Sequence, residues 1–373
     1  MPKVLRIDRK LYNFEKPPLV PSSTVGLNKG DILILCAGFE DRSITVLNNA
    51  INSGKSDFSI VLVEYLPNVP ENKTNEIMKK CSEYRISVDR LLYDRENPPS
   101  IRNKLLDILH PVECRIFVDI SGMSRLLIVQ ILNVLGNPPF NFSRSTILYS
   151  MAQEYPPSEK EVDAAISKME EDSLHSAMFL SSDVFELAVV PELSSVSSEG
   201  QPIRVVAFPS FNPNQLAALR SEIQASSFTL IHGIPPLEEN AWRPEKINIL
   251  NRIEDISNRV DLEVSTLEYN ETLKLLLDIY DKYGVLERII IAPTGSKMQT
   301  VAVGIFRAFM EDIQIVYPTP RIFPKPKEYT KGVRQLYQLQ LDSFSDIRSS
   351  SNKYAWGKWG EISGIGEILA FSW

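Results

Sequence analysis

The chain has 373 residues, is 43% hydrophobic and 23% charged, and carries a net charge of −7, which suggests two globular domains. It has no apolar run of about 18 residues that would cross a membrane, and its first 20 residues carry charges where a signal peptide is apolar, so we expect a cytoplasmic protein without membrane contact. The acidic balance argues against a dedicated duplex-DNA binder, which normally presents a basic face.

The first half of the chain alternates buried strands with helices. The pattern predicts strands at 31–37, 59–65, 86–92, 115–121 and 145–150, and helices at 43–54, 71–84, 100–110 and 124–136. Continuous apolar strands that alternate with helices indicate a mostly parallel sheet covered on both faces.

A segment of different character separates this series from a second one. It contains a candidate acidic helix followed by a Ser-rich linker. After it the pattern predicts strands at 203–209, 228–234, 262–268, 288–294 and 313–319, and helices at 214–224, 244–259, 271–284 and 296–310. A further strand is predicted at 332–344, and the aromatic tail that follows it is expected to pack against the protein.

The two series have the same order of elements at a nearly constant offset. Ile203 lies 172 residues after Asp31 (203 − 31), and Thr294 lies 173 after Ser121 (294 − 121). We therefore predict an internal duplication: an α/β fold with two tandem Rossmann-like domains, mostly parallel sheets and a pseudo-two-fold relation. The alternative is one large doubly wound sheet. The expected divisions are an N-terminal extension (1–30), domain 1 (31–154), a helical linker (155–201), domain 2 (202–330) and a C-terminal strand and tail (331–373).

Two corresponding loops follow the fourth strand of each series. They read Ser121-Gly122-Met123-Ser124-Arg125 and Thr294-Gly295-Ser296-Lys297. Each offers hydroxyls, a glycine that lets the backbone approach a ligand, and a cation at a helix N-terminus, which together would hold a phosphate. The alternative is that the serines only cap the helices. We expect both loops to face one shared cleft.

A third loop, after the first strand, runs from Gly38 to Ser43 and contains Glu40, Asp41 and Arg42. Rossmann folds usually place ligand contacts here, so these charged residues are candidates for catalysis, and Gly38 and Ser43 for ligand binding. Two close acids would repel, and one would then hold its proton nearer neutrality and serve as a general acid or base. We favour Glu40, because Asp41 is better placed to cap the next helix. The alternative is a capped turn with solvated charges.

Several classes of site are not expected. Neither loop matches the Walker A pattern, and no GxGxxG follows either first strand, which argues against an ATPase and a dinucleotide enzyme. The three histidines and three cysteines have no metal-ligand spacing, so we predict no metal site and no cofactor. The segment 321–334 is rich in cations and would be either a solvated loop or a contact for single-stranded nucleic acid.

The loops after the fourth strands resemble those of the CRISPR-associated Rossmann-fold (CARF) sensors of cyclic oligoadenylates. Thr294-Gly295-Ser296-Lys297 is the closer match to that family's loop and Ser121-Gly122-Met123-Ser124-Arg125 the more distant one. The resemblance covers roughly 31–150 and 203–320, and it implies binding of a cyclic nucleotide across two related halves. The family usually has two adjacent glycines where this chain has one, and no nuclease domain is recognisable.

Three functions from different classes remain open. The first is a nucleotide-binding sensor or regulatory subunit of a bacterial antiviral defence system, with a nucleotide or other anionic small ligand and with protein partners. The second is an enzyme that hydrolyses a nucleotide or phosphodiester through the loop 38–43. The third is an interaction subunit of a larger complex that binds no ligand.

Overall fold

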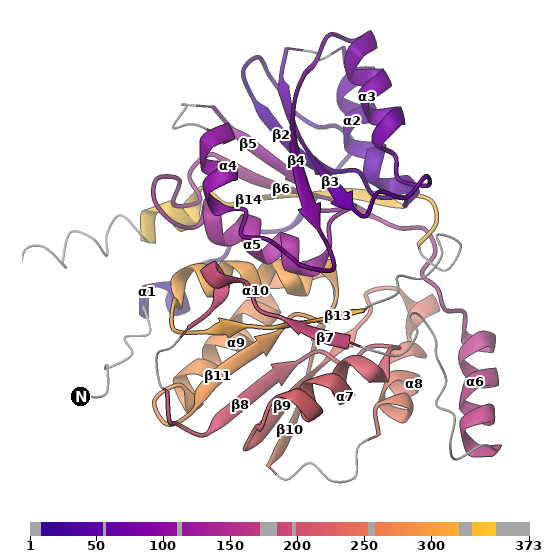
Figure 1. Cartoon of the computed structure of the whole chain (residues 1–373), viewed down its shortest axis with the longest axis vertical. Coiled ribbons are helices and arrows are strands. Elements are labelled where there is room, and N and C mark those ends of the chain that lie inside the picture. Colours follow the sequence, from indigo (N-terminus) through magenta and orange to yellow (C-terminus); the bar gives the residue numbers. More distant parts are fainter. Residues whose placement is uncertain are drawn as a thin grey trace, which may run out of the picture.

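The computed structural model describes residues 9–54, 57–109, 114–171, 185–195, 199–252, 258–320 and 330–347. Over these residues the chain is an α/β protein with largely parallel sheets, as predicted (Figure 1). The helices are α1 (Arg9–Asn13), α2 (Thr45–Asn52), α3 (Thr74–Glu83), α4 (Arg102–Leu109), α5 (Arg125–Leu135), α6 (Glu159–Glu171), α7 (Pro213–Glu222), α8 (Arg243–Leu250), α9 (Tyr269–Tyr283) and α10 (Lys297–Phe309).

The first sheet has seven strands in the order β1-β14-β6-β5-β2-β3-β4. These are β1 (Val20–Ser22), β2 (Ile32–Cys36), β3 (Ser59–Leu66), β4 (Ser87–Asp94), β5 (Ile116–Asp119), β6 (Ser145–Met151) and β14 (Gln335–Gln340). β2 to β6 pair in parallel, and β14 runs antiparallel to both β6 and β1. Alternate residues of β2 pack on opposite faces, Ile34 in one cluster with side chains of α4 and α5 and Leu35 in another with α2 and α3. This double coverage explains the continuous apolar run.

The second sheet has five parallel strands in the order β10-β9-β8-β11-β12. They are β8 (Ile203–Ala207), β9 (Ser227–Ile234), β10 (Arg259–Ser265), β11 (Arg288–Ala292) and β12 (Gln314–Ile315). Here too the first strand is covered on both faces: Val205 packs with α7, and Val206 packs in the cluster that holds α9 and α10. A third sheet pairs β7 (Phe185–Ala188) with β13 (Tyr317–Pro320).

Each predicted series of five strands takes the same order in its own sheet: third, second, first, fourth, fifth. We call β2–β6 with their helices the first unit, and β8–β12 with theirs the second unit. The alternative of one continuous sheet is wrong, because the two series belong to different sheets. The common order agrees with the predicted duplication, while the pseudo-two-fold relation stays a prediction.

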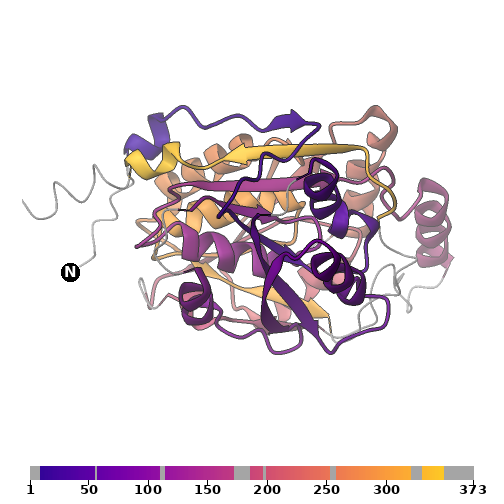
Figure 2. The same ribbon diagram turned by 90° about the horizontal axis from the view of Figure 1, so that it is seen from above.

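Parts of the segments predicted to lie outside the repeat form strands of the sheets, while the aromatic tail expected to pack against the protein lies outside the described residues. β14, from the predicted C-terminal segment, extends the first sheet between β6 and β1 and lies far in sequence from both (Figure 2). β7, from the predicted linker, pairs with β13, so the strand expected at 313–319 is divided into two short ones. The strand predicted at 332–344 is thus confirmed as β14, whereas β7 was not predicted, because hydrogen-bonding edges recruit strands from distant parts of the chain.

Helices α5 and α10 form the contact between the units (Figure 1). A Cβ on Gly304 of α10 would lie 2.8 Å from the Cβ of Leu132, and a Cβ on Gly136 would lie 2.5 Å from that of Ala308. Such close approach requires glycine at both places. Each pair is separated by 172 residues (304 − 132 and 308 − 136), so residues of the first unit face their own counterparts in the second. The two helices consequently run side by side in the same direction, with their N-termini together.

Candidate functional site

A cavity of about 460 Å³ lies where the carboxyl ends of the two parallel sheets meet. Loops that follow β2, β4, β5, β8, β10 and β11 line it, together with the ends of β3, β6 and β9. Open parallel sheets bind ligands at this edge, and small-molecule pockets typically have volumes of about 300–1,000 Å³. The cavity is therefore the candidate site.

The loops 121–125 and 294–297 both contribute to this cavity, and their cations cross from one unit to the other. The guanidinium of Arg125 donates to the carbonyl of Gly295. In return, Nζ of Lys297 donates to the carbonyls of Ile120 at 3.1 Å and Met123 at 2.7 Å. The cations that were expected to hold an anion thus bridge the two loops through neutral acceptors.

The hydroxyls of these loops have structural partners. Ser121 is fully buried, does not line the cavity, and accepts from the backbone N–H of Ser150 at 2.8 Å. Thr294 is held by Phe208, donating to its carbonyl at 2.7 Å and accepting from its N–H at 3.1 Å.

Ser124 and Ser296 line the cavity but also cap α5 and α10, and Ser296 forms a capping box with Gln299. The position of Ser121 thus argues against a ligand contact. Ser124 and Ser296 both cap a helix and reach the cavity, so their contact with a ligand stays a prediction.

The glycines of these loops are needed for close packing between loops. A Cβ on Gly122 would lie 2.7 Å from the carbonyl oxygen of Cys36, and one on Gly295 would lie 3.0 Å from the Cβ of Phe208. Each glycine thus lets the loop after the fourth strand press against the end of the first strand of its own unit. Both also line the cavity, so the expected close approach to a ligand remains a prediction.

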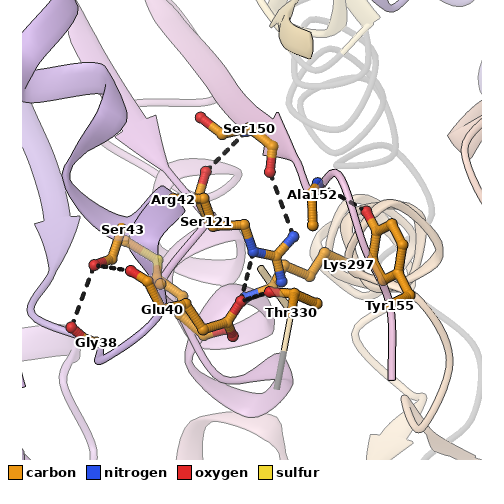
Figure 3. Close-up of polar contacts among 12 residues, drawn as sticks. Gly38, Glu40, Arg42, Ser43, Ser121, Ser150, Ala152, Tyr155, Lys297 and Thr330 are labelled. Carbon is orange, nitrogen blue, oxygen red and sulfur yellow. Dashed lines mark hydrogen bonds and ion pairs between the residues drawn. The ribbon is translucent and has the colours of Figure 1, made fainter. Parts of the chain in front are cut away.

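The loop after β2 places a buried ion pair at the cavity (Figure 3). Nε of Arg42 lies 2.6 Å from a carboxylate oxygen of Glu40, and their side chains are 5% and 12% exposed. Arg42 also donates to the carbonyl of Ser150 at 3.3 Å, and Glu40 accepts from the hydroxyl of Thr330. Gly38 lines the cavity beside this pair.

Two residues of this loop do not belong to the site. Asp41 is exposed, does not line the cavity, and begins a short 3₁₀ helix whose N-cap is Glu40. Ser43 is buried, and its hydroxyl donates to the carbonyl of Glu40 at 2.7 Å. Their positions argue against a catalytic role for Asp41 and a ligand contact for Ser43, because the turn directs one to solvent and the other into the protein.

The charges around the cavity shift the pKa values of Glu40 and Lys297. Burial by itself raises the pKa of the Glu40 carboxyl, but the charges of Arg42 and Lys297 outweigh it and hold that pKa below its ordinary value. Burial lowers the pKa of Lys297 to about 7, and the positive charge of Arg42 acts in the same direction. The expected proton-holding acid at position 40 is thus corrected to an ionised carboxylate, because its neighbours are cations and Asp41 points away.

Sequence reasoning did not single out Asp119, the last residue of β5, which lies buried behind the cavity lining and contacts Ser121. Its side chain is 1% exposed, and one oxygen accepts from the N–H of Ser121 at 2.9 Å, while the other has no hydrogen-bond partner among the described residues. Burial raises the pKa of Asp119 to about 6. Its position at the carboxyl end of a predicted buried strand could have drawn attention to it in the sequence, although it does not line the cavity.

Sequence reasoning also missed most of the aromatic and some of the cationic lining. The hydroxyl groups of Tyr149 and Tyr155 form a hydrogen bond of 3.0 Å. The guanidinium of Arg95 lies 4.8 Å from the ring centre of Tyr65. The described residues of the lining include the following aromatic and cationic side chains: Phe39, Tyr65, Tyr149, Tyr155, Phe211, Tyr317, Arg42, Arg95, Arg125, Arg243 and Lys297. Several lie at predicted strand ends, a position that would have identified them.

The loop after β8 forms the opposite wall and carries amides in place of charges. Ser210 donates to the amide oxygen of Gln215 at 2.9 Å and accepts from the N–H of Asn212 at 3.1 Å. Asn251 donates to the carbonyl of Ser210 at 2.7 Å, which fixes the loop from behind.

Arg243 stands beside this wall. Its guanidinium donates to the carbonyls of Tyr155 and Pro157 and lies 4.9 Å from the ring centre of Phe211.

Comparison with known proteins gives only distant structural similarities. No family model and no curated protein matches the chain. It is similar to the cytoplasmic domain of a prokaryotic cation chloride cotransporter (9% identity, 79% of this chain and 96% of that one, TM-score 0.23). It is also similar to a universal stress protein from Archaeoglobus fulgidus DSM 4304 (11%, 78% and 97%, 0.20) and to apo UGT2 of Phytolacca americana (10%, 86% and 90%, 0.22). Similarities at this level carry no information about the site.

Two further expectations concern partners. Most of the basic segment 321–334 lies outside the described residues; within it, Thr330 reaches the cavity and Arg334 pairs with Glu239 at 2.7 Å. Contact with single-stranded nucleic acid therefore stays a prediction. Within the described part of the chain, no helix has the length and apolar character that crossing a membrane requires.

Proposed function

We propose that this protein binds a nucleotide or a related anionic small molecule in the cavity between its two units. The observation that carries the proposal is the charge of the lining. Among the described residues, the lining holds Arg42, Arg95, Arg125, Arg243 and Lys297 but a single carboxylate, Glu40, in a protein whose net charge is −7. Such a local excess of cations in an acidic chain favours an anion.

The hydrogen bonds that these cations make in the free protein can be replaced by hydrogen bonds to a ligand. Arg125 and Lys297 donate to backbone carbonyls, which are neutral acceptors. A phosphate oxygen carries negative charge, so a bond from a cation to it adds a Coulomb attraction that a bond to a neutral carbonyl lacks. A phosphate that enters the cavity therefore competes favourably for both side chains, and the aromatic lining adds surfaces on which a base can stack.

We further propose that binding serves a sensor or regulatory subunit of a bacterial antiviral defence system that acts with protein partners. The support is the resemblance of the two loops to those of CARF sensors, together with their position at one shared cavity. Residues of both units line the cavity, so a ligand contacts both at once and can couple them.

Mass spectrometry of small molecules released from natively purified protein tests the proposal, followed by thermal unfolding with each nucleotide found. A ligand at 100 times its dissociation constant stabilises the folded state by about 2.7 kcal/mol, which raises the melting temperature measurably. Lys297→Met and Arg125→Gln should each weaken binding by about 1.5–3 kcal/mol. Absence of any bound or stabilising phosphate compound would instead favour a ligand-free interaction subunit.

A further inference from the structure

The two walls of the cavity differ in charge. We define the cationic floor as Arg42, Arg95, Arg125 and Lys297, and the neutral wall as Ser210, Phe211, Asn212 and Gln215 of the loop after β8 and the start of α7. Within the floor, Arg42 follows β2, and the wall follows β8, which is the corresponding strand of the second unit. The loop 38–43 carries charges, whereas the loop 209–214 carries none.

Three of the four cations of the floor belong to the first unit. Arg42 and Arg95 follow strands of that unit, while Arg125 donates across to the carbonyl of Gly295 in the second unit. Lys297 comes from the second unit, but its ammonium donates to Ile120 and Met123 of the first, and its pKa is affected by Arg42 and Glu40. A phosphate therefore has one preferred end of the cavity.

The neutral wall has the chemistry that recognises a heteroaromatic ring. The hydrogen bond from Ser210 holds the amide of Gln215 in a fixed direction, and Asn251 secures the loop behind it. Side-chain amides read the edges of bases through paired donors and acceptors. Arg243 places one cation beside this wall. It donates to two backbone carbonyls, and its guanidinium lies 4.9 Å from the ring centre of Phe211, so its planar group adds a flat surface.

We infer that the ligand is a nucleotide charged at one end, with its phosphate at the cationic floor and its base against the neutral wall. This rests on the proposed function and deepens it. A symmetric ligand would require equivalent groups at both ends of the cavity, and the divergence of the two loops removes that equivalence.

Titration calorimetry on the full chain with four probes tests the inference: pyrophosphate, ribose 5-phosphate, AMP and cyclic diadenylate. AMP should bind at least tenfold more tightly than ribose 5-phosphate, a difference of about 1.4 kcal/mol. Gln215→Met should reduce this ratio of affinities to near one. Lys297→Met should weaken the binding of AMP and of ribose 5-phosphate by similar factors, so the ratio of the two affinities should be preserved. Lys104→Met, at an exposed position on α4, is the matched control for loss of a lysine.

Each other outcome has a distinct meaning. If AMP and ribose 5-phosphate bind equally to the wild type, or if Gln215→Met leaves their ratio unchanged, the base does not lie on the neutral wall. If cyclic diadenylate binds more than tenfold better than AMP, the one-ended ligand is wrong while nucleotide binding stands. If no probe binds, the proposed function fails and this inference fails with it. The comparison of AMP with ribose 5-phosphate is made on the wild-type protein, so it does not depend on whether a variant folds.

Discussion

Lys297 is the cation of the described lining whose pKa lies near neutrality. Burial lowers its pKa to about 7; Arg42 and Arg125 act in the same direction, Glu40 opposes them, and the ammonium donates to neutral carbonyls. A lysine with this pKa is about half protonated at neutral pH, so the floor is only partly charged before binding. A phosphate placed beside it favours the protonated form and raises the pKa again.

Binding of a phosphate compound should therefore take up protons. At pH 7 we expect an uptake of about half a proton per ligand, rising as the pH increases to about 8, because Lys297 is neutral when free and charged when bound. Affinity should fall as the pH rises above 7 and level off below it, where the lysine is charged in both states. Calorimetry in buffers of different ionisation enthalpy measures the uptake, and Lys297→Met should abolish it. An uptake that persists in this variant would assign the proton to another group.

Glu40 is expected to oppose ligand binding while stabilising the fold. Glu40→Gln removes a buried charge that pairs with Arg42 at 2.6 Å, so the free energy of unfolding should fall by about 2 kcal/mol. The same change removes the carboxylate from the lining, so affinity for pyrophosphate should increase about tenfold. Urea unfolding and calorimetry measure the two effects.

Glu83→Gln is the matched control, since Glu83 pairs with Lys79 at 3.9 Å on the exposed surface of α3. Loss of binding in Glu40→Gln would instead assign the carboxylate a direct contact with the ligand.

At the scale of elements, periodicity in the sequence was a good guide wherever an element is buried. The strands at 31–37 and 203–209 appear as β2 and β8 with nearly the expected limits, because both faces of each are covered. The loops after β5 and β11 were also recognisable as helix starts. The hydrogen-bond partners of their hydroxyls were not, since the partners of Ser121 and Thr294 lie 29 and 86 residues away in the chain, and no local pattern encodes such pairs.

The contact between α5 and α10 leads to a prediction about glycine. Replacing glycine by alanine inside a helix normally stabilises it by up to about 1 kcal/mol. At Gly304 the new methyl group would lie 2.8 Å from the Cβ of Leu132, so Gly304→Ala should instead lower the free energy of unfolding by about 1–3 kcal/mol. Denaturant unfolding compares it with Gly26→Ala, whose methyl group would meet nothing within 4 Å. A stabilised Gly304→Ala variant would contradict the close packing.

At the scale of the whole molecule, the alternation of strands and helices predicted two series but not how they are joined. One hydrophobic cluster contains Leu127 of α5, Val303 of α10 and Phe344 near the end of the described chain. Residues 9–22 contribute as well: Tyr12 donates to Asp278 of α9 at 2.6 Å, and β1 pairs with β14. These contacts join positions hundreds of residues apart, which a pattern with a period of two or 3.6 residues cannot encode.

This shared cluster predicts that both units unfold together. Hydrogen exchange followed by mass spectrometry should give the same free energy of opening for β2 and β5 as for β8 and β11, within about 1 kcal/mol. A first unit that opens at much lower free energy than the second would show two independent domains and contradict a common core.

The position of β14 also constrains how the protein is made. β6 ends at Met151 and its antiparallel neighbour β14 begins at Gln335, 184 positions later (335 − 151). At about 5–20 residues per second, a ribosome needs roughly 10–40 s to cover that distance. During this time the nascent first sheet presents the apolar strand β6 as an open edge, a template on which other chains can pair. The first sheet is therefore completed only after residue 340 has been synthesised, and until then the edge of β6 stays open to pairing with other chains.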